Sequence, residues 1–396
     1  LQELLQRDAV AFALEQLLKL GLGEVPADAL QRLLLRPVSR RQVQRWIADE
    51  RLPAASLGAE FLKALMDPVR WQADPVVAAL RGQDAESAEA YREPDPSLAA
   101  LARELLADVR KFKAEDLGFE WLLGLVARDD EALHAFAVDY LTRAFLPSDF
   151  AEPGEGGEAA PAQAEDADLG GASFLFTGKL ATMTRSEAKK KVSGARGANA
   201  SGVNGKLDYL VIGDEGSPLY GEGRKGSKQV KAEKLIEGGA SLRIISETAF
   251  LKMLAGEALG GDAASAEAGA ERLWAMAFDP GPVDAPRARF ARHYLRMHHP
   301  KICPAETDRY VDPGAEIPEA FLSFERVQPL LDDPRQAVRA VAVEFARYEF
   351  GRWQPPLMAL VALAESRHPE VRELVAKALS ADEHDPDWRD ARIDPA

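Results

Sequence analysis

The stretch that decides the fold of the central part of this chain is residues 173–178, which read SFLFTG, followed at 184–187 by TRSE. The first is a compact apolar run ending at Thr177 and Gly178, a pattern typical of a buried strand. The second is a capping box, in which the Thr184 hydroxyl and the Glu187 carboxylate satisfy the first backbone donors of a lysine-rich helix. The stretch therefore predicts a strand, a turn and a basic helix.

Two further strand patterns follow, at 207–212 (LDYLVI) and 242–245 (LRII), and a Gly-Ser-Lys sequence at 226–228 starts another helix. Strands that alternate with helices favour a parallel sheet, because each crossover helix returns the chain to the same edge of the sheet. We therefore expect a small parallel sheet covered by helices on both faces.

This order, closed by Ile244-Ile245-Ser246 and a helix that carries Phe250, resembles a BRCT domain of the kind found in bacterial NAD-dependent DNA ligases. The resemblance covers residues 171–255, about a fifth of the chain, and implies a four-stranded parallel sheet with three helices. The loop between Asp214 and Gly226 is longer than in the ligases. Phe250 replaces a Trp that is often found in the third helix of the family, and the ligases share this difference.

In the ligase and replication factor C members of that family, a phosphate is bound at positions that have counterparts here. The candidate phosphate- or DNA-binding residues are Thr177, Gly178, Arg185, Lys228, Lys231, Arg224 and Lys225. The resemblance implies that Thr177 gives a hydroxyl, Gly178 a backbone amide and Arg185 and Lys228 the charges. Lys231 would substitute for Lys228, and the long loop adds Arg224 and Lys225.

The chemistry supports that assignment independently, since backbone donors at a helix N-terminus with a guanidinium and an ammonium suit an anion with several acceptor oxygens. The anion could be a DNA 5′-phosphate or a phosphorylated Ser or Thr side chain. DNA is favoured, because phosphopeptide-reading BRCT pairs need a second copy and none is visible, and because Tyr220 offers a stacking surface. The alternative is that Thr177 and Gly178 only turn the chain while the lysines are solvated.

Charge is distributed unevenly along the chain. The 396 residues are 46% hydrophobic and 29% charged, with a net charge of −15, which argues against nonspecific binding of nucleic acid by the whole surface. Residues 171–255, however, carry 14 Lys and Arg against 8 Asp and Glu, and the rest carries 35 against 56. The basic charge is thus concentrated in one central module, defined here as residues 171–255.

The flanks of the central module have helical periodicity. Asp332-Asp333-Pro334 with Val338-Arg339 returns as His368-Pro369 with Val371-Arg372, 33 residues later, and Asp129-Asp130 with Leu133 repeats the pattern before the module. This resembles HEAT-type helical repeats, whose stacked helix pairs form an extended surface. The alternative is an irregular helical domain whose helices begin with ordinary Asp and Pro punctuation.

The expected organisation is multidomain, with all-α HEAT-like regions flanking a small α/β BRCT domain. The predicted boundaries are 1–147 (helical), 148–170 (acidic linker), 171–255 (BRCT), 256–270 (linker) and 271–396 (helical). The linkers are predicted from Ala, Gly, Glu and Asp without hydrophobic periodicity. The start at Leu1 without a methionine is consistent with a piece of a longer protein.

Other motifs give weaker indications of function. The G-x-G-x-x-G match at 221–226 begins nine residues after Ile212, too late for a dinucleotide site, and no Lys-x-Asp-Gly adenylation motif occurs. His293, His298, His299 and Cys303 lack the paired spacing of a zinc site. No catalytic constellation can be singled out. The sequence therefore predicts a protein that is not an enzyme and has no cofactor and no metal.

Residues 39–47, SRRQVQRWI, resemble the recognition helix of excisionase-like helix-turn-helix proteins. They are a second candidate for DNA contact. The alternative is a helix with Val43, Trp46 and Ile47 facing inward and its arginines in solvent.

The lone cysteine, the lack of a charged-then-apolar leader and the shortness of the apolar runs predict a cytoplasmic protein with no membrane contact. The function we expect is a non-catalytic DNA-associated scaffold. Its BRCT module would bind a DNA end or nick while helical repeats recruit an unknown protein partner, in DNA repair or maintenance. The alternatives are an adaptor for a phosphorylated protein with no DNA contact, and a regulatory fragment of a larger enzyme.

Overall fold

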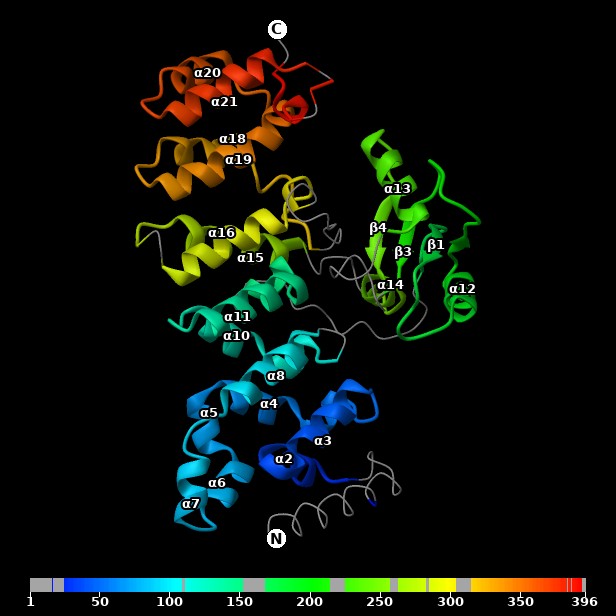
Figure 1. The fold of residues 1–396 in the computed structure, drawn as a ribbon. Helices are drawn as coiled ribbons and strands as arrows, with labels where there is room; N and C mark the ends of the chain where they lie inside the picture. Colours follow the sequence, from blue (N-terminus) through cyan, green and yellow to red (C-terminus); the bar gives the residue numbers. More distant parts are fainter. Residues whose placement is uncertain are drawn as a thin grey trace. The chain divides into compact units, whose positions relative to one another are not determined.

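The computed structural model describes residues 16, 25–108, 111–151, 168–213, 225–256, 263–282, 285–303, 315–382, 384–385 and 387–393. They belong to two units, Leu1–Ala144 and Phe145–Ala396. Over the described ranges the first unit is helical, and the second combines helices with one small sheet (Figure 1). The predicted combination of a helical protein with a small α/β part is confirmed.

Three helices of the first unit begin at Asp-Pro pairs. Asp67, Asp74 and Asp95 each accept a backbone N–H from the first turn of the helix that follows, and a proline takes the first helical position. The helices are α2 Ala27–Leu35, α3 Pro37–Ala48, α4 Ala59–Met66, α5 Pro68–Ala73, α6 Pro75–Arg81, α7 Ala85–Ala90, α8 Pro96–Ala107, α9 Ala114–Leu117, α10 Phe119–Val126 and α11 Glu131–Ala144, with a 3-10 turn η2 at Ala54–Leu57. Their apolar stripes form a core that includes Leu34, Trp46 and Tyr140.

The helical part of the second unit lies on both sides of the central module in sequence. Its elements are η3 Pro147–Phe150, α15 Ala263–Phe278, α16 Pro286–Met297, α18 Phe324–Val327, η5 Gln328–Asp332, α19 Gln336–Trp353, α20 Leu357–Ala364, α21 Pro369–Ser380 and η6 Arg389–Ala391. Phe150 is fully buried against Tyr294, with ring centroids 4.8 Å apart. Residues before and after the module therefore share one core.

The observed helices overlap the predicted linkers 148–170 and 256–270 at two places. Residues 263–270 lie in α15 although they were expected in the linker 256–270, because Ala and Glu are strong helix formers and their lack of apolar periodicity does not prevent a helix. Residues 147–150 form η3, so the acidic linker cannot begin at 148. Gly269 lies against η3 so closely that a Cβ there would be 1.8 Å from the Pro147 oxygen.

The sequence repeat in the second unit corresponds to a repeated local structure. Val338 in α19 and Val371 in α21 are both fully buried. The following arginines both reach back to the turn before their helix: Arg339 Nη1 donates to Pro334 O at 2.9 Å, and Arg372 Nη1 donates to Ser366 O at 2.7 Å. The two helix starts are therefore built alike.

The central module contains a four-stranded parallel sheet in the order β2-β1-β3-β4. Its strands are β1 Ser173–Thr177, β2 Ala198–Asn199, β3 Tyr209–Ile212 and β4 Arg243–Ser246, and its helices are α12 Arg185–Gly194, α13 Ser227–Glu237 and α14 Glu247–Leu254 (Figure 1). The four parallel strands and three helices agree with the expected architecture.

Alternation along β1 sends its side chains to two cores. Phe174 and Phe176 pack with α12 and α14 through Val192 and Phe250, on one face of the sheet. Leu175 points to the other face, where Ala232 of α13 lies. The sheet is thus covered on both faces, and the carboxyl ends of all four strands meet at one edge.

Candidate phosphate-binding site

The site is built at the carboxyl end of β1. Thr177 is paired with Ile212 of β3, and the Gly213 amide donates to the Thr177 carbonyl at 2.9 Å. Gly178 then turns the chain with a φ of +72°, a conformation that favours glycine. A Cβ on Gly213 would be 2.2 Å from the Lys179 oxygen. Two glycines therefore let the end of β3 press against the loop that follows β1.

The loop ends in the predicted capping box, which is confirmed. The Thr184 amide donates to Glu187 Oε2 at 2.8 Å, and the Glu187 amide donates to Thr184 Oγ1 at 3.3 Å. Hydrogen bonds from the Thr184 backbone and then its hydroxyl hold the pKa of Glu187 below its ordinary value. The capping box starts α12 at Arg185 and leaves the positive end of that helix beside the loop.

Arg185 is exposed and reaches back over this loop. Its Nη2 donates to the Gly178 carbonyl at 2.6 Å. The same residues line a shallow pocket of about 510 Å³, formed by Gly178, Lys179, Leu180, Met183, Thr184 and Arg185. Because a guanidinium has five N–H donors, one bond to a carbonyl leaves it able to bind an anion.

Lys228 approaches the same segment from α13. The side chain is half-buried, and its Nζ lies 3.5 Å from the Phe176 carbonyl oxygen. Thr177, itself half-buried, lies between the carbonyls that Lys228 and Arg185 reach. The structure thus brings Thr177, Gly178, Arg185 and Lys228 to one short piece of backbone, although only Gly178 and Arg185 line the pocket.

The remaining predicted residues contribute less. Lys231 is exposed on α13, one turn beyond Lys228. Lys225 lies 3.7 Å from Glu233 Oε1, so a neighbouring carboxylate offsets its charge. Arg224 and Tyr220 lie outside the described residues.

Glu247 is a site residue that sequence reasoning missed. Its side chain is fully buried at the start of α14, and it accepts hydrogen bonds from the Ala181 amide at 2.6 Å and the Thr182 amide at 2.9 Å. The Thr182 hydroxyl donates to it as well, at 2.6 Å. A glutamate directly after the Ser246 N-cap is ordinarily an exposed first-turn residue, so the sequence contains no local sign of this contact.

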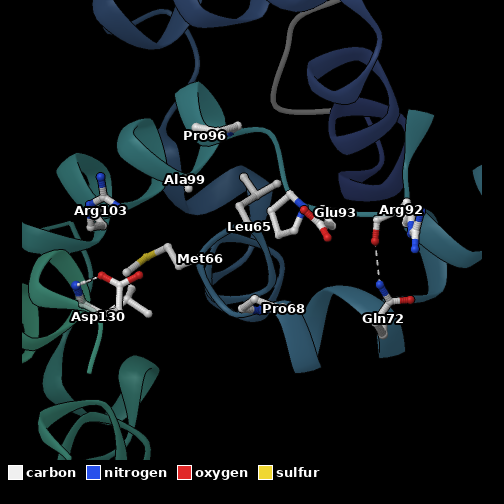
Figure 2. A pocket seen from close by; sticks show the side chains of 12 residues that line it. Leu65, Met66, Pro68, Gln72, Arg92, Glu93, Pro96, Ala99, Arg103 and Asp130 are labelled. Atoms are coloured by element: carbon white, nitrogen blue, oxygen red, sulfur yellow. Dashed lines mark hydrogen bonds between the residues drawn. The ribbon is translucent and has the colours of Figure 1, made fainter. Parts of the chain in front are cut away.

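A second hollow, of about 570 Å³, lies in the first unit (Figure 2). It is lined by Leu65, Met66, Pro68, Gln72, Arg92, Glu93, Pro94, Pro96, Ala99, Arg103, Asp130 and Leu133. Its Asp130 accepts the Ala132 and Leu133 amides and so caps α11, and its Gln72 donates to the Arg92 carbonyl. The lining contains two cationic residues, Arg92 and Arg103, and two anionic residues, Glu93 and Asp130. The charges of this hollow therefore favour neither an anionic nor a cationic ligand.

The other DNA-contact candidate, residues 39–47, forms most of α3. Val43 and Trp46 are fully buried, and Arg40 donates to Asp95 and to the carbonyls of Leu34 and Leu35. This arrangement matches the alternative of a helix that packs its apolar side inward, except that Arg40 is held by these contacts and does not lie free in solvent.

His298 and His299 pack against aromatic and acidic side chains of the core. His298 stacks on Tyr294 at 3.9 Å between ring centroids, and buried His299 has its Nε2 3.2 Å from Glu349. Within the described ranges, no group of three or more His, Cys, Asp or Glu residues could hold a metal ion. Of the helices described, none is long and apolar enough to cross a bilayer.

Comparison with known proteins finds DNA ligases. The chain is 42% identical over 86 residues to the DNA ligase of Coprothermobacter proteolyticus, and 44% identical over 88 residues to that of Trichlorobacter lovleyi; each match covers 22% of this chain and 11% of the ligase. The DNA ligase of Nitratidesulfovibrio vulgaris is 43% identical over 95 residues, 24% of this chain and 10% of the ligase. No protein-family model and no solved structure matches the chain.

These matches contradict the prediction that the protein is not an enzyme, since each of these relatives is a DNA ligase. The prediction rested on the absence of one adenylation motif and of a visible catalytic constellation. That absence was too narrow a ground, because the chain spans only about a tenth of the length of the curated relatives it matches. The chain is thus similar to DNA ligases over about a fifth of its own length.

Proposed function

We propose that the central module is a BRCT domain that binds the phosphate of a DNA end or nick, and that the chain acts in DNA repair or maintenance. The observation that carries the proposal is the convergence of Arg185 and Lys228 on residues 176–178. The matches to DNA ligases support it, because their length of 86 to 95 residues is that of the module.

The local electrostatics suit a terminal phosphate. Arg185 begins α12, so its guanidinium and the positive end of the helix lie on the same side of the pocket. A phosphate there would accept from the free donors of Arg185 while Lys228 balances its second charge. Exposed Lys189, Lys190 and Lys191 continue along α12 and would attract neighbouring backbone phosphates.

The test compares a 5′-phosphorylated duplex end with the same end carrying a hydroxyl, using fluorescence anisotropy on the full chain. We expect tighter binding of the phosphorylated end, and loss of that preference in Arg185→Ala/Lys228→Ala. The matched control is Lys206→Ala/Arg243→Ala, which removes the same charge from exposed residues at the opposite edge of the sheet. Equal binding of the two ends by the unaltered protein would reject the proposal.

A phosphoprotein ligand is the competing outcome of the same experiment. If the module reads a phosphorylated Ser or Thr, a phosphopeptide will displace a labelled probe and an oligonucleotide end will not. We favour DNA because the relatives that the chain matches are DNA ligases.

We also propose that the helical regions are HEAT-like repeats that recruit a protein partner. The repeat is supported by the similar N-termini of α19 and α21, where an arginine donates to a carbonyl of the preceding turn. The exposure of Leu357 (74%) and Met358 (76%) on α20 supports a contact surface, since exposed adjacent apolar side chains mark interaction sites. The variant Leu357→Glu/Met358→Glu should no longer bind proteins that the unaltered chain captures from a cell extract. Its thermal unfolding should be unchanged.

A further inference from the structure

We infer that Glu247 is a positioning residue for the phosphate site, which holds the loop 178–184 in its binding shape without touching the ligand. The inference rests on the proposed function of that site. It concerns a side chain that is remote in sequence from the loop and lies beneath it.

Hydrogen bonds hold the loop at its start, its middle and its end. At its start, the Gly178 carbonyl accepts from Arg185. At its end, Thr184 and Glu187 form the capping box. Its middle is held by Glu247, which takes both the Ala181 and the Thr182 amides and the Thr182 hydroxyl. The first two contacts are local in sequence, whereas Glu247 links the middle of the loop to the carboxyl end of β4 by hydrogen bonds, beside the packing of Leu180 in the same core as Ile245.

A carboxylate suits this position better than any other side chain of its size. Oε2 accepts the Ala181 amide, and Oε1 accepts the Thr182 amide and hydroxyl. In a glutamine, one of these oxygens becomes an NH₂ group, which would face an N–H donor and could not accept from it. The buried charge of Glu247 is tolerated because three donors replace its water.

The contact also determines which donors remain for a ligand. The amides of Ala181 and Thr182 point at Glu247 and are not available to an anion. A phosphate in the pocket is therefore left to Arg185, to Lys228 and to backbone donors other than these two amides, and the placement of Arg185 depends on the path of the loop. At metal sites, groups that orient a ligand commonly affect affinity by about 10-fold to 100-fold, and we take the lower figure as the scale for this site.

The test is Glu247→Gln in the full chain, with the preference for a 5′-phosphorylated over a 5′-hydroxyl duplex end as the readout. We expect that preference to fall at least about 10-fold, measured at a temperature where thermal unfolding shows the variant to be folded. The matched control is Asp208→Asn. Asp208 accepts the Ser173 amide at 2.8 Å and hydroxyl at 2.7 Å at the opposite end of β1. It should affect stability and leave the preference intact.

A second pair of variants keeps the inference testable if Glu247→Gln does not fold. Thr182→Val removes only the hydroxyl donor and should weaken the preference, while Thr182→Ser keeps that donor and should restore it. If the unaltered protein shows no preference, the proposed function fails. If it shows one and both folded Glu247→Gln and Thr182→Val retain it, the proposed function stands and the role of Glu247 is refuted.

Discussion

Arg185 and Lys228 come from different helices and reach carbonyl oxygens two residues apart on β1 and the turn after it. Arg185 Nη2 lies 2.6 Å from Gly178 O, and Lys228 Nζ lies 3.5 Å from Phe176 O. Among the residues that the structure describes, both cations thus contact backbone carbonyls and not a carboxylate. Their charges remain uncompensated by these contacts, which is the condition for attracting an anion.

Lys228→Ala should reduce the salt dependence of DNA binding. Each phosphate contact releases about one counterion, so the slope of log Kd against log salt should become shallower by about one. Anisotropy titrations over a range of salt concentrations measure the slope. An unaltered slope would place Lys228 outside the contact, and Lys206→Ala is the control that should leave it unaltered.

Gly213→Ala should destabilise the central module by about 1 to 3 kcal/mol, the usual cost of overpacking. The added methyl would lie 2.2 Å from the Lys179 oxygen, so the loop after β1 would have to move. Hydrogen exchange of the β1 and β3 amides reports the opening of this module. Gly205→Ala is the control, because a Cβ there meets no atom within 4 Å; equal effects of the two changes would count against close packing of β3 on the loop.

Phe176→Ala should destabilise the same module more strongly, by about 3 to 5 kcal/mol. Phe176 is 3% exposed and packs edge-to-face on Phe250, with centroids 5.0 Å apart. The same hydrogen-exchange measurement applies, with exposed Lys189→Ala as the control. If the amides of β1 and β3 stay protected from exchange in Phe176→Ala, the Phe176 ring does not contribute to the stability of this core.

Arg339→Ala should destabilise the C-terminal helices by about 2 kcal/mol, because it leaves two carbonyl groups and the Glu370 carboxylate without the donor that the buried Arg339 provides. Arg339 donates to the carbonyls of Asp333 and Pro334 and to Glu370 Oε1 at 2.8 Å, which links α19 to the start of α21. Arg372→Ala removes a single hydrogen bond, to the Ser366 carbonyl, which is more exposed to solvent. It should therefore lower the free energy of unfolding by less than Arg339→Ala. Denaturant titration of both variants tests the order, and a reversed order would contradict it.

Stability of the first unit should depend on Asp95 at acid pH. Hydrogen bonding from Ser97, opposed by burial and assisted by Arg40, lowers the pKa of Asp95 from 3.8 to about 2. Because the folded pKa lies below the ordinary one, the stabilisation is complete above about pH 4 and is lost as the pH falls through about 2. Asp95→Ala should therefore cost about 1 kcal/mol at neutral pH and progressively less below pH 4.

Denaturant titrations of the unaltered chain and Asp95→Ala at pH 7 and pH 3 measure that convergence. Asp28→Ala is the control, since Asp28 makes only an exposed contact with Arg32 at 3.5 Å. A difference between the unaltered chain and Asp95→Ala that is the same at both pH values would contradict the assignment.

The parts of the fold that could be predicted are those encoded in neighbouring residues. The SFLFTG strand and the TRSE capping box depend on contacts within a few positions, and both have the expected form. The approach of Lys228 to β1 was reached only through a family resemblance. The contacts of Glu247 with Ala181 and of Phe150 with Tyr294 depend on how distant segments meet, and nothing in the local sequence of either residue reports its partner.

The parallel arrangement of the four strands has a consequence for where the ends of the module lie relative to the pocket. All carboxyl ends of the strands share the edge that holds Gly178, so β1 begins at the far edge, and α14 runs back toward that far edge before the chain leaves at Gly256. The described ends of the module therefore lie away from the edge that holds the candidate pocket.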